Sequence, residues 1–241
     1  MGMMTFKSDL LEKVPRLPDT TSFRFSRPPE YTFEAGHFFS ITIDSPDGPL
    51  THSFSHADSP TEGWIELTTR LTGSPFKTAL DSLPLGAEAE VEGPYGTFLF
   101  AYDEPKIAFL TGGVGFTPVR SMLRYLADTG GAGRIAGQEI VLIFGSMTED
   151  GILYRDEIEA FAQAIPGMRV VHVITKPSET WSGHSGFITA DVVKAELGAP
   201  TGWKYYIVGP PPMIDAMWKV MNTLEIAAPR VTVEGFAGYQ S

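Results

Sequence analysis

Cysteine is absent from the 241-residue sequence. The chain alone therefore forms no disulfide, no thiolate-bound zinc site and no cysteine-held iron–sulfur cluster. No apolar run approaches the length of about 18 residues that indicates a transmembrane helix, and no basic segment followed by an apolar one marks a secretory signal. Met1-Gly2 begins like a myristoylation signal, but Phe6 occupies the position that needs Ser or Thr. We therefore expect a cytoplasmic protein without stable insertion into a membrane.

An excess of basic residues is also missing. The sequence has 18 Lys and Arg against 29 Asp and Glu, a net charge of −11, which argues against binding to nucleic acid. The same charge disfavours docking of a strongly acidic partner, unless basic side chains gather locally. With 43% hydrophobic and 12% aromatic residues, the chain has enough apolar material for real cores. Its length suits one large domain or two of about 100–140 residues.

The two halves of the chain differ in pattern. Residues 1–102 contain short apolar runs broken by Pro, Gly, Asp and Ser, which predicts an antiparallel β-barrel. From Lys106 onward, apolar strands alternate with helical patterns, which predicts a parallel sheet in an α/β domain over residues 103–241. Asp103-Glu104-Pro105 is the expected boundary. The expected strands are 21–25, 38–43, 64–70, 106–110, 139–144, 169–174 and 204–208, and the expected helices are 74–82, 154–165, 190–197 and 211–223.

The most informative stretch is Thr111-Gly112-Gly113-Val114-Gly115-Phe116-Thr117-Pro118, between an apolar run and a helical pattern. Gly113 and Gly115 permit a tight turn that brings backbone N–H groups close to a ligand. Thr117 can cap the following helix, and Pro118 suits its first turn. A helix N-terminus opened by glycines favours an anion, so the stretch indicates a phosphate site. Pro118 stands where a Rossmann turn carries its third glycine, which points to a different nucleotide-binding lineage.

Four further blocks accompany this stretch along the chain. They are Thr51-His52-Ser53-Phe54-Ser55, Gly93-Pro94-Tyr95-Gly96, Val208-Gly209-Pro210-Pro211-Pro212-Met213 and Glu234-Gly235-Phe236. Together, the five blocks form an ordered series that resembles the ferredoxin–NADP⁺ reductase family, from about Gly36 to the C-terminus. The resemblance implies a flavin-binding barrel followed by a nicotinamide-binding domain.

In that family an Arg-x-Tyr-Ser block binds the flavin, and the resemblance carries its roles to His52, Phe54 and Ser55. His52 would hold the pyrophosphate, Phe54 would pack on the isoalloxazine, and Ser55 would hydrogen-bond near the reactive N5. Two positions depart from the family pattern. Phe54 lacks the tyrosine hydroxyl, and at position 52 a histidine replaces a permanent bidentate cation. Arg70, near the end of a neighbouring strand, can supply the missing charge.

The expected flavin site extends beyond this block. The resemblance implies that Gly73-Ser74-Pro75, which opens the short helix, binds flavin phosphate through backbone donors at a helix N-terminus. Ser53 within the block and Thr69 beside Arg70 complete the expected cofactor-binding set.

The second domain carries the blocks for the nicotinamide cofactor. Five residues of the glycine stretch match the family's turn for this cofactor, namely Gly113, Val114, Gly115, Thr117 and Pro118. The turn Gly209-Pro210-Pro211 matches the one that lines the nicotinamide pocket. Phe236 resembles the aromatic that covers the flavin face and moves for nicotinamide, and Glu234 resembles the acid that supports the nicotinamide or a proton path. Because the chain runs on beyond Phe236, Tyr239 lies either over another part of the flavin or at the surface.

These parts imply an NAD(P)H-dependent flavoprotein reductase. Bound FAD would take a hydride from NADH or NADPH and pass electrons on singly. The acceptor would be a separate molecule, with ferredoxin or flavodoxin as the family default and a ferric chelate, a free flavin, an oxygenase component or a membrane partner as rivals. The alternative is a flavin-binding electron-transfer subunit of a larger complex, but retention of Gly113, Gly115 and Pro118 argues against it.

The choice between the two nicotinamide cofactors depends on the turn after the strand 139–144. Ser146 suits the 2′-phosphate of NADP⁺, but Met147 offers no charge there. Glu149 and Asp150 would repel a phosphate, although Arg155 would partly compensate if it folded back. The balance favours NADH.

Overall fold

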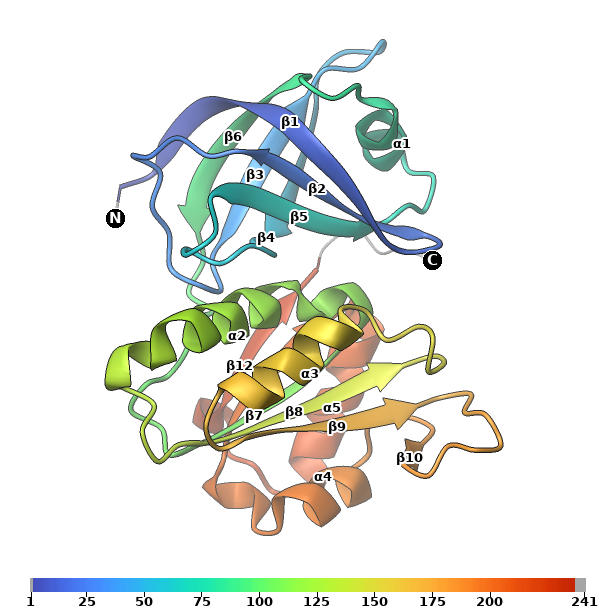
Figure 1. Ribbon diagram of the computed structural model, residues 1–241. Coiled ribbons are helices and arrows are strands. Elements are labelled where there is room, and N and C mark those ends of the chain that lie inside the picture. The colour runs from blue at the N-terminus through green and yellow to red at the C-terminus, as the bar shows by residue number, and fades with distance from the viewer. Residues whose placement is uncertain (1, 237–241) are drawn as a thin grey trace. The chain divides into compact units, whose positions relative to one another are not determined.

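The computed structural model describes residues 2–236, so Tyr239 lies outside the described residues. Within this range the chain forms two compact units (Figure 1). Unit 1 runs to Phe100 and also includes Thr117–Asp128. Unit 2 comprises Ala101–Phe116 and the chain from Thr129 onward. In the described range, no helix has the length and apolar character needed to cross a membrane.

Unit 1 is built on a curled antiparallel sheet of six strands. The order is β4-β3-β6-β1-β2-β5, so β4 and β5 lie at the two ends of the sheet. The strands are β1 (Met4–Leu17), β2 (Thr20–Ser26), β3 (Phe38–Ile43), β4 (Leu50–Ser55), β5 (Trp64–Arg70) and β6 (Glu88–Tyr95). Side chains from these strands form an apolar core that includes Phe23, Phe25, Phe39, Ile41 and Val91. The predicted antiparallel barrel is confirmed.

The sequence pattern missed strands β4 and β6 and the longest strand of the sheet, β1. Its pairing with β2 shifts register between Leu10 and Glu12 and again between Pro15 and Leu17. Such irregularities break the alternation of apolar and polar side chains by which a strand is recognised. The expected strands at 21–25, 38–43 and 64–70 are present, and the expected short helix is α1 (Pro75–Ser82).

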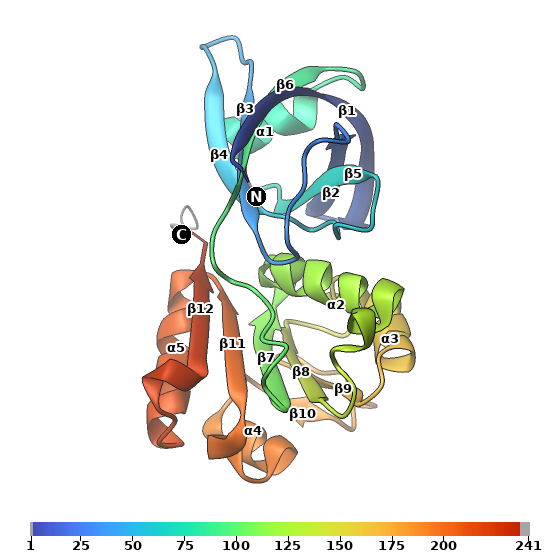
Figure 2. The same ribbon diagram turned by 90° about the vertical axis from the view of Figure 1, so that its left-hand side faces the viewer.

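Unit 2 is built on a parallel sheet of six strands with the order β10-β9-β8-β7-β11-β12 (Figure 2). The strands are β7 (Lys106–Gly112), β8 (Glu139–Ser146), β9 (Met168–Ile174), β10 (His184–Ser185), β11 (Lys204–Gly209) and β12 (Val231–Gly235), and the helices include α3 (Arg155–Ala164), α4 (Ala190–Leu197) and α5 (Pro211–Thr223). The predicted α/β domain with a parallel sheet is confirmed. The strand order reverses between β7 and β11, and ligands of such sheets bind at the carboxyl ends of the strands beside this reversal.

Helix α2 (Thr117–Thr129) follows the short turn η1 (Gly113–Phe116) in sequence, and its buried polar side chains contact the β4–β5 connection of unit 1. The Arg120 guanidinium is almost fully buried, lies 3.0 Å from a Glu62 carboxylate oxygen and donates to the main-chain oxygen of Ala57. Ser121 donates its hydroxyl to the main-chain oxygen of Asp58 at 2.5 Å. These buried bonds attach α2 to unit 1.

Candidate functional site

An aromatic group joins β4 to the start of α1. His52 and Phe54 alternate along β4 and so share one face of the sheet, and their ring centroids lie 4.7 Å apart. Phe76, in the first turn of α1, lies 5.4 Å from the His52 ring and 5.7 Å from the Phe54 ring. The His52 Nδ1 also lies 2.9 Å from the main-chain oxygen of Ser53. The structure therefore brings His52 and Phe54 beside the helix that Gly73-Ser74-Pro75 opens.

The two serines of the β4 block lie apart from this aromatic group. Ser53 is exposed on the other face of the sheet, where its hydroxyl lies 3.3 Å from that of Ser40. Ser55 is buried at the last position of β4, opposite Phe38 of β3. Ser55 therefore has a fixed position at the end of β4, whereas the Ser53 side chain lies away from the aromatic group.

Two cations lie near the start of α1. Arg70 ends β5, is more than half exposed and pairs with Asp19 at 2.9 Å. Lys77, in the first turn of α1, is buried, and its Nζ donates to the Thr72 hydroxyl at 3.3 Å. Burial lowers the pKa of Lys77, and the nearby charge of Arg70 lowers it further. Sequence reasoning missed Lys77, because its burial cannot be read from the sequence.

The start of α1 fits the diphosphate of a flavin dinucleotide. Gly73 adopts a φ of +75°, and a Cβ added there would meet nothing within 4 Å, so a ligand can approach its main chain. A helix N-terminus and two neighbouring cations form a donor set that suits a diphosphate. The aromatic group on β4 suits a flat ring. Thr69, which precedes Arg70, is buried within β5.

The glycines of the turn after β7 serve two purposes. A Cβ on Gly115 would lie 2.7 Å from the main-chain oxygen of Val208, so Gly115 allows η1 to pack directly against the end of β11. Thr111 strengthens the same contact, because its hydroxyl donates to the Val208 oxygen at 3.0 Å. Gly113 has a φ of +53° and open space where a Cβ would stand, so its main chain is accessible. The other predicted residues of this stretch lie in η1 or at the start of α2, and they are Val114, Thr117 and Pro118.

The ends of β11 and β12 complete this edge of the sheet. Gly209 ends β11, and Pro210 and Pro211 begin the chain of α5. Glu234 of β12 pairs with Val208, and the N–H of Phe236 donates to the Gly209 oxygen at 3.3 Å. The structure therefore brings the predicted residues Gly115, Gly209, Glu234 and Phe236 to neighbouring strand ends at the reversal of strand order.

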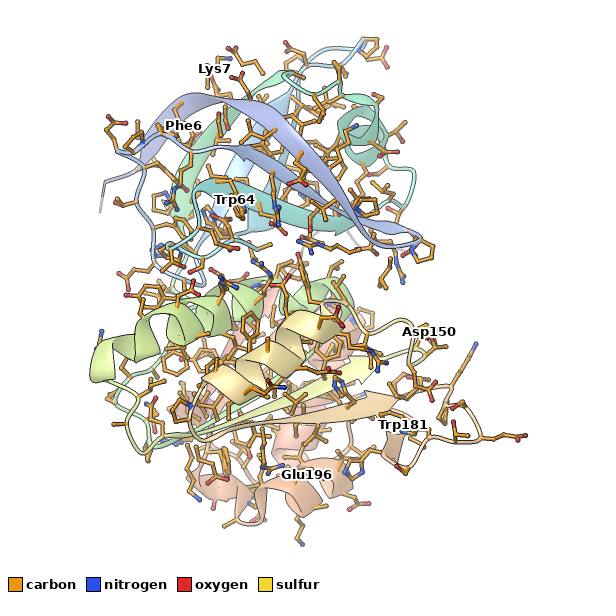
Figure 3. The ribbon with its side chains drawn as sticks, viewed as in Figure 1. Phe6, Lys7, Trp64, Asp150, Trp181 and Glu196 are labelled. Carbon is orange, nitrogen blue, oxygen red and sulfur yellow. The ribbon has the colours of Figure 1, made fainter. Side chains whose placement is uncertain are left out.

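Ser146 ends β8 on the other side of β7. Its side chain is buried, and its hydroxyl has no hydrogen-bond partner among residues 2–236. Glu149 accepts hydrogen bonds from the Ser178 N–H at 3.1 Å and from its hydroxyl at 2.7 Å, and these bonds lower the pKa of Glu149. Arg155 does fold back, but onto the main-chain oxygen of Glu149. Figure 3 shows Asp150 and Trp181 beyond the carboxyl ends of β8 and β9.

Comparison with known proteins agrees with this geometry. The family model for the oxidoreductase NAD-binding domain matches residues 109–219. An NADH-cytochrome b5 reductase 1 of Emericella nidulans is 30% identical over 89% of this chain and 73% of the relative. A ferredoxin–NADP reductase B of Sorangium cellulosum is 30% identical over 82% of each chain. The solved structure of a ferredoxin NADP⁺ reductase from Neisseria gonorrhoeae with bound FAD and NADP superposes with a TM-score of 0.82 at 19% identity, over 96% of this chain and 98% of that one.

The chain belongs to the ferredoxin–NADP⁺ reductase family, a family of FAD- and NAD(P)-binding oxidoreductases. The resemblance of the five sequence blocks is confirmed at the level of the family. The chain spans 48%, 64% and 61% of the length of three fungal NADH-cytochrome b5 reductases that it matches.

Proposed function

We propose that this protein is an FAD-dependent NAD(P)H oxidoreductase that passes electrons from the nicotinamide cofactor to a separate acceptor. The observation that carries the proposal is the turn at Gly113, which leaves its main chain open at the reversal of strand order while Gly115 fixes the turn against β11. A turn of this kind offers backbone donors to a diphosphate. Membership of the family supports the same function.

The bound flavin would supply the chemistry, since it takes a hydride from reduced nicotinamide and releases electrons one at a time. The chain's own residues bind and orient. Arg70, Lys77 and the N-terminus of α1 would hold the flavin diphosphate, with Phe54 against the flat ring and the Ser55 hydroxyl near N5. Phe236, held through its main chain to Gly209, would cover the ring until nicotinamide displaces it.

NADH is the proposed electron donor. Glu149 lies in the turn after β8 that would receive the 2′ position of the ribose, and Ser178 holds its carboxylate in the ionised form. An ionised carboxylate there repels a 2′-phosphate, while Arg155 is bonded to the main chain of Glu149.

The proposed acceptor is a separate one-electron carrier. Ferredoxin and flavodoxin remain the first candidates, and cytochrome b5 joins them from the names of the relatives. Ferric chelates, free flavins and an oxygenase component stay as rivals, because a chain with a net charge of −11 does not favour a strongly acidic partner. If the protein is instead an electron-transfer subunit of a larger complex, it should bind flavin that neither NADH nor NADPH reduces.

The purified protein, reconstituted with FAD, tests the proposal by anaerobic titration with NADH and then NADPH. We expect bleaching of the flavin absorption by both cofactors, with NADH effective at lower concentration. Glu149→Gln should improve the use of NADPH about tenfold relative to NADH, because one repelling charge is removed, while Glu179→Gln, in the same segment as Ser178, is the matched control. Failure to bind flavin overturns the function. Bound flavin that neither cofactor reduces supports the subunit role.

A further inference from the structure

Three hydrogen-bonding side chains form a buried chain in unit 1, made of Tyr31, His56 and Asp58. The His56 Nδ1 lies 2.9 Å from the Asp58 Oδ1, and the Tyr31 hydroxyl lies 3.0 Å from the His56 Nε2. The imidazole is fully buried and stacked face to face on the Phe33 ring, with centroids 3.7 Å apart and an interplanar angle of 9°. Both ring nitrogens and one ring face of His56 are therefore occupied by partners.

The bonding pattern holds the imidazole from both sides. The Asp58 Oδ1, which faces the His56 Nδ1, also accepts the N–H of Glu66 at 2.8 Å. The other nitrogen, Nε2, faces the Tyr31 hydroxyl. A change in any one of these three side chains leaves a buried polar atom of its neighbour without a partner.

Stability alone does not account for this chain of bonds. Asp58 is fully buried, and its Oδ2 has no hydrogen-bond partner among the described residues. Burial raises the pKa of Asp58. A buried carboxylate with one oxygen unpartnered costs folding free energy, so its presence favours a role in holding a particular geometry.

The chain of bonds lies directly beyond the strand that carries the proposed flavin residues. β4 is an end strand of the sheet, paired with β3 alone, and it stops at Ser55. The next residue is His56, whose N–H donates to the His37 oxygen at 3.0 Å. Ser55 makes the last pair between β4 and β3. Beyond this pair, the direction of the chain is set by the bonds of His56 and of the residues that follow it.

Those following residues are held equally firmly. The N–H of Ala57 donates to the Glu66 oxygen at 2.8 Å, and the Ala57 oxygen accepts from Arg120. The main-chain oxygen of Asp58 accepts from Ser121. Because neighbours on both sides fix the segment, a shift of the His56 ring is transmitted along the chain to Ser55 rather than absorbed in a loop.

We propose that Tyr31, His56 and Asp58 are positioning residues that hold Ser55 against the flavin and thereby set the reduction potential of the flavin. The inference rests on the proposed function, because it requires a flavin near Ser55. Removal of one bond leaves the Ser55 hydroxyl intact but loosens the side chain of His56, the next residue, so that the main chain at Ser55 can shift. Small displacements at a reacting centre have large effects on rate, about 100-fold for 1 Å.

The test uses the full chain reconstituted with FAD, in the wild type and in Tyr31→Phe, Asp58→Asn and Ser55→Ala. We expect Ser55→Ala and Asp58→Asn to shift the equilibrium for flavin reduction about tenfold, which is about 30 mV for a two-electron couple. Tyr31→Phe removes a single oxygen and should slow reduction by NADH about threefold, with unchanged affinity for NADH. The potential and the visible spectrum of the bound flavin are the readouts besides rate.

A double-mutant cycle separates positioning from a general loss of structure. If Asp58 acts through Ser55, Asp58→Asn adds no further shift of potential in a Ser55→Ala background, whereas additive shifts overturn the inference. If Asp58→Asn does not fold, Tyr31→Phe takes its place, and the cycle combines Tyr31→Phe with Ser55→Ala. Glu196→Gln is the matched control, because it breaks another histidine–carboxylate pair, His184–Glu196 at 2.6 Å in unit 2, and should leave the potential unchanged.

The outcomes distinguish this inference from the proposed function. A wild-type protein that binds no flavin refutes the function itself. Flavin that binds and is reduced by NADH, with a potential that ignores Tyr31→Phe and Asp58→Asn, refutes the positioning role alone. A reduction potential that Ser55→Ala leaves unchanged also refutes the positioning role, because Tyr31, His56 and Asp58 would then have no group through which to act on the flavin.

Discussion

Glu66 is the most deeply buried carboxylate engaged by arginines in unit 1, and its replacement by Gln is our principal prediction for stability. The side chain is fully buried on β5, with Arg16 of β1 at 2.9 Å and Arg24 of β2 at 2.8 Å. Burial alone would raise the pKa of Glu66, but the charges of Arg120 and Arg16, with hydrogen bonds from Arg24 and Ser22, lower it to about 2. The carboxylate is therefore ionised in the folded protein and binds the arginines together.

The pKa shift of Glu66 and the cost of breaking a buried ion pair both give the size of the effect. A lowering of the pKa of Glu66 from 4.5 to about 2 corresponds to roughly 3 kcal/mol in favour of the folded state, at about 1.4 kcal/mol per pKa unit. Removal of one partner from a buried ion pair costs about 3–5 kcal/mol, because the remaining charge stays buried. We expect Glu66→Gln to destabilise unit 1 by about 3 kcal/mol at pH 7.

The effect depends on pH in a defined direction. Because the pKa of Glu66 is lower in the folded state, its contribution is fully present above about pH 4.5 and is lost as the pH falls toward 2. The difference between wild type and Glu66→Gln should therefore be constant from pH 7 to about 5 and shrink below that. This direction is opposite to the one expected of a lysine or histidine stabilised in its charged form.

Native-state hydrogen exchange measures this difference, because it reports the free energy of opening separately for each strand. Peptides from β2 and β5 should lose protection in Glu66→Gln, while peptides from β7 and β8 of unit 2 serve as the internal control. The matched variant Glu12→Gln removes an exposed partner of Arg24, 2.8 Å away, and should cost no more than about 1 kcal/mol. Equal protection of β5 in wild type and Glu66→Gln at pH 7 would refute the reasoning.

Three further predictions concern the proposed cofactor sites. Gly115→Ala should destabilise unit 2 by about 1–3 kcal/mol, because the added Cβ has no room beside Val208. The loss should be measurable as faster hydrogen exchange in β11. The control variant Gly113→Ala places its Cβ in open space and should cost only backbone strain of about 1–2 kcal/mol. Lys77→Met should weaken FAD binding about tenfold or more by equilibrium dialysis, whereas an unchanged dissociation constant would remove Lys77 from the diphosphate site. Phe236→Ser should tighten NADH binding in an anaerobic titration, since the nicotinamide no longer competes with a covering ring, and an unchanged affinity would contradict that role.

Much of the fold could be predicted because its signals are local. The buried strands of unit 2 are continuous apolar runs, which a parallel sheet covered by helices requires, and 106–110 and 139–144 were recognisable for that reason. The glycine turn was recognisable because both of its causes, a left-handed φ at Gly113 and a close contact at Gly115, favour glycine. Strand β1 was not recognisable, because its bulges break the alternation of apolar and polar side chains that identifies a strand.

The rest of the candidate site depends on contacts between distant residues. Tyr31 meets His56 across 25 positions of sequence, and Arg120 meets Glu62 across 58, so no local pattern reveals either contact. Lys77 was missed because its importance comes from burial beside Arg70, which the sequence does not display. The resemblance to the family identified the β4 block as a whole, but the structure was needed to separate the inward Phe54 from the outward Ser53.

The attachment of α2 to unit 1 limits how this protein can be divided. A fragment that stops near residue 102 would contain every strand of the antiparallel sheet yet lack Arg120 and Ser121. Glu62 would then lose its buried cation, and the main-chain oxygens of Ala57 and Asp58 would lose their donors. The flavin-binding unit therefore cannot be cut out or exchanged at a single crossover point, because it includes α2 as well as the chain up to Phe100. A chimera of this chain with a relative must take α2 from the same parent as the β4–β5 connection.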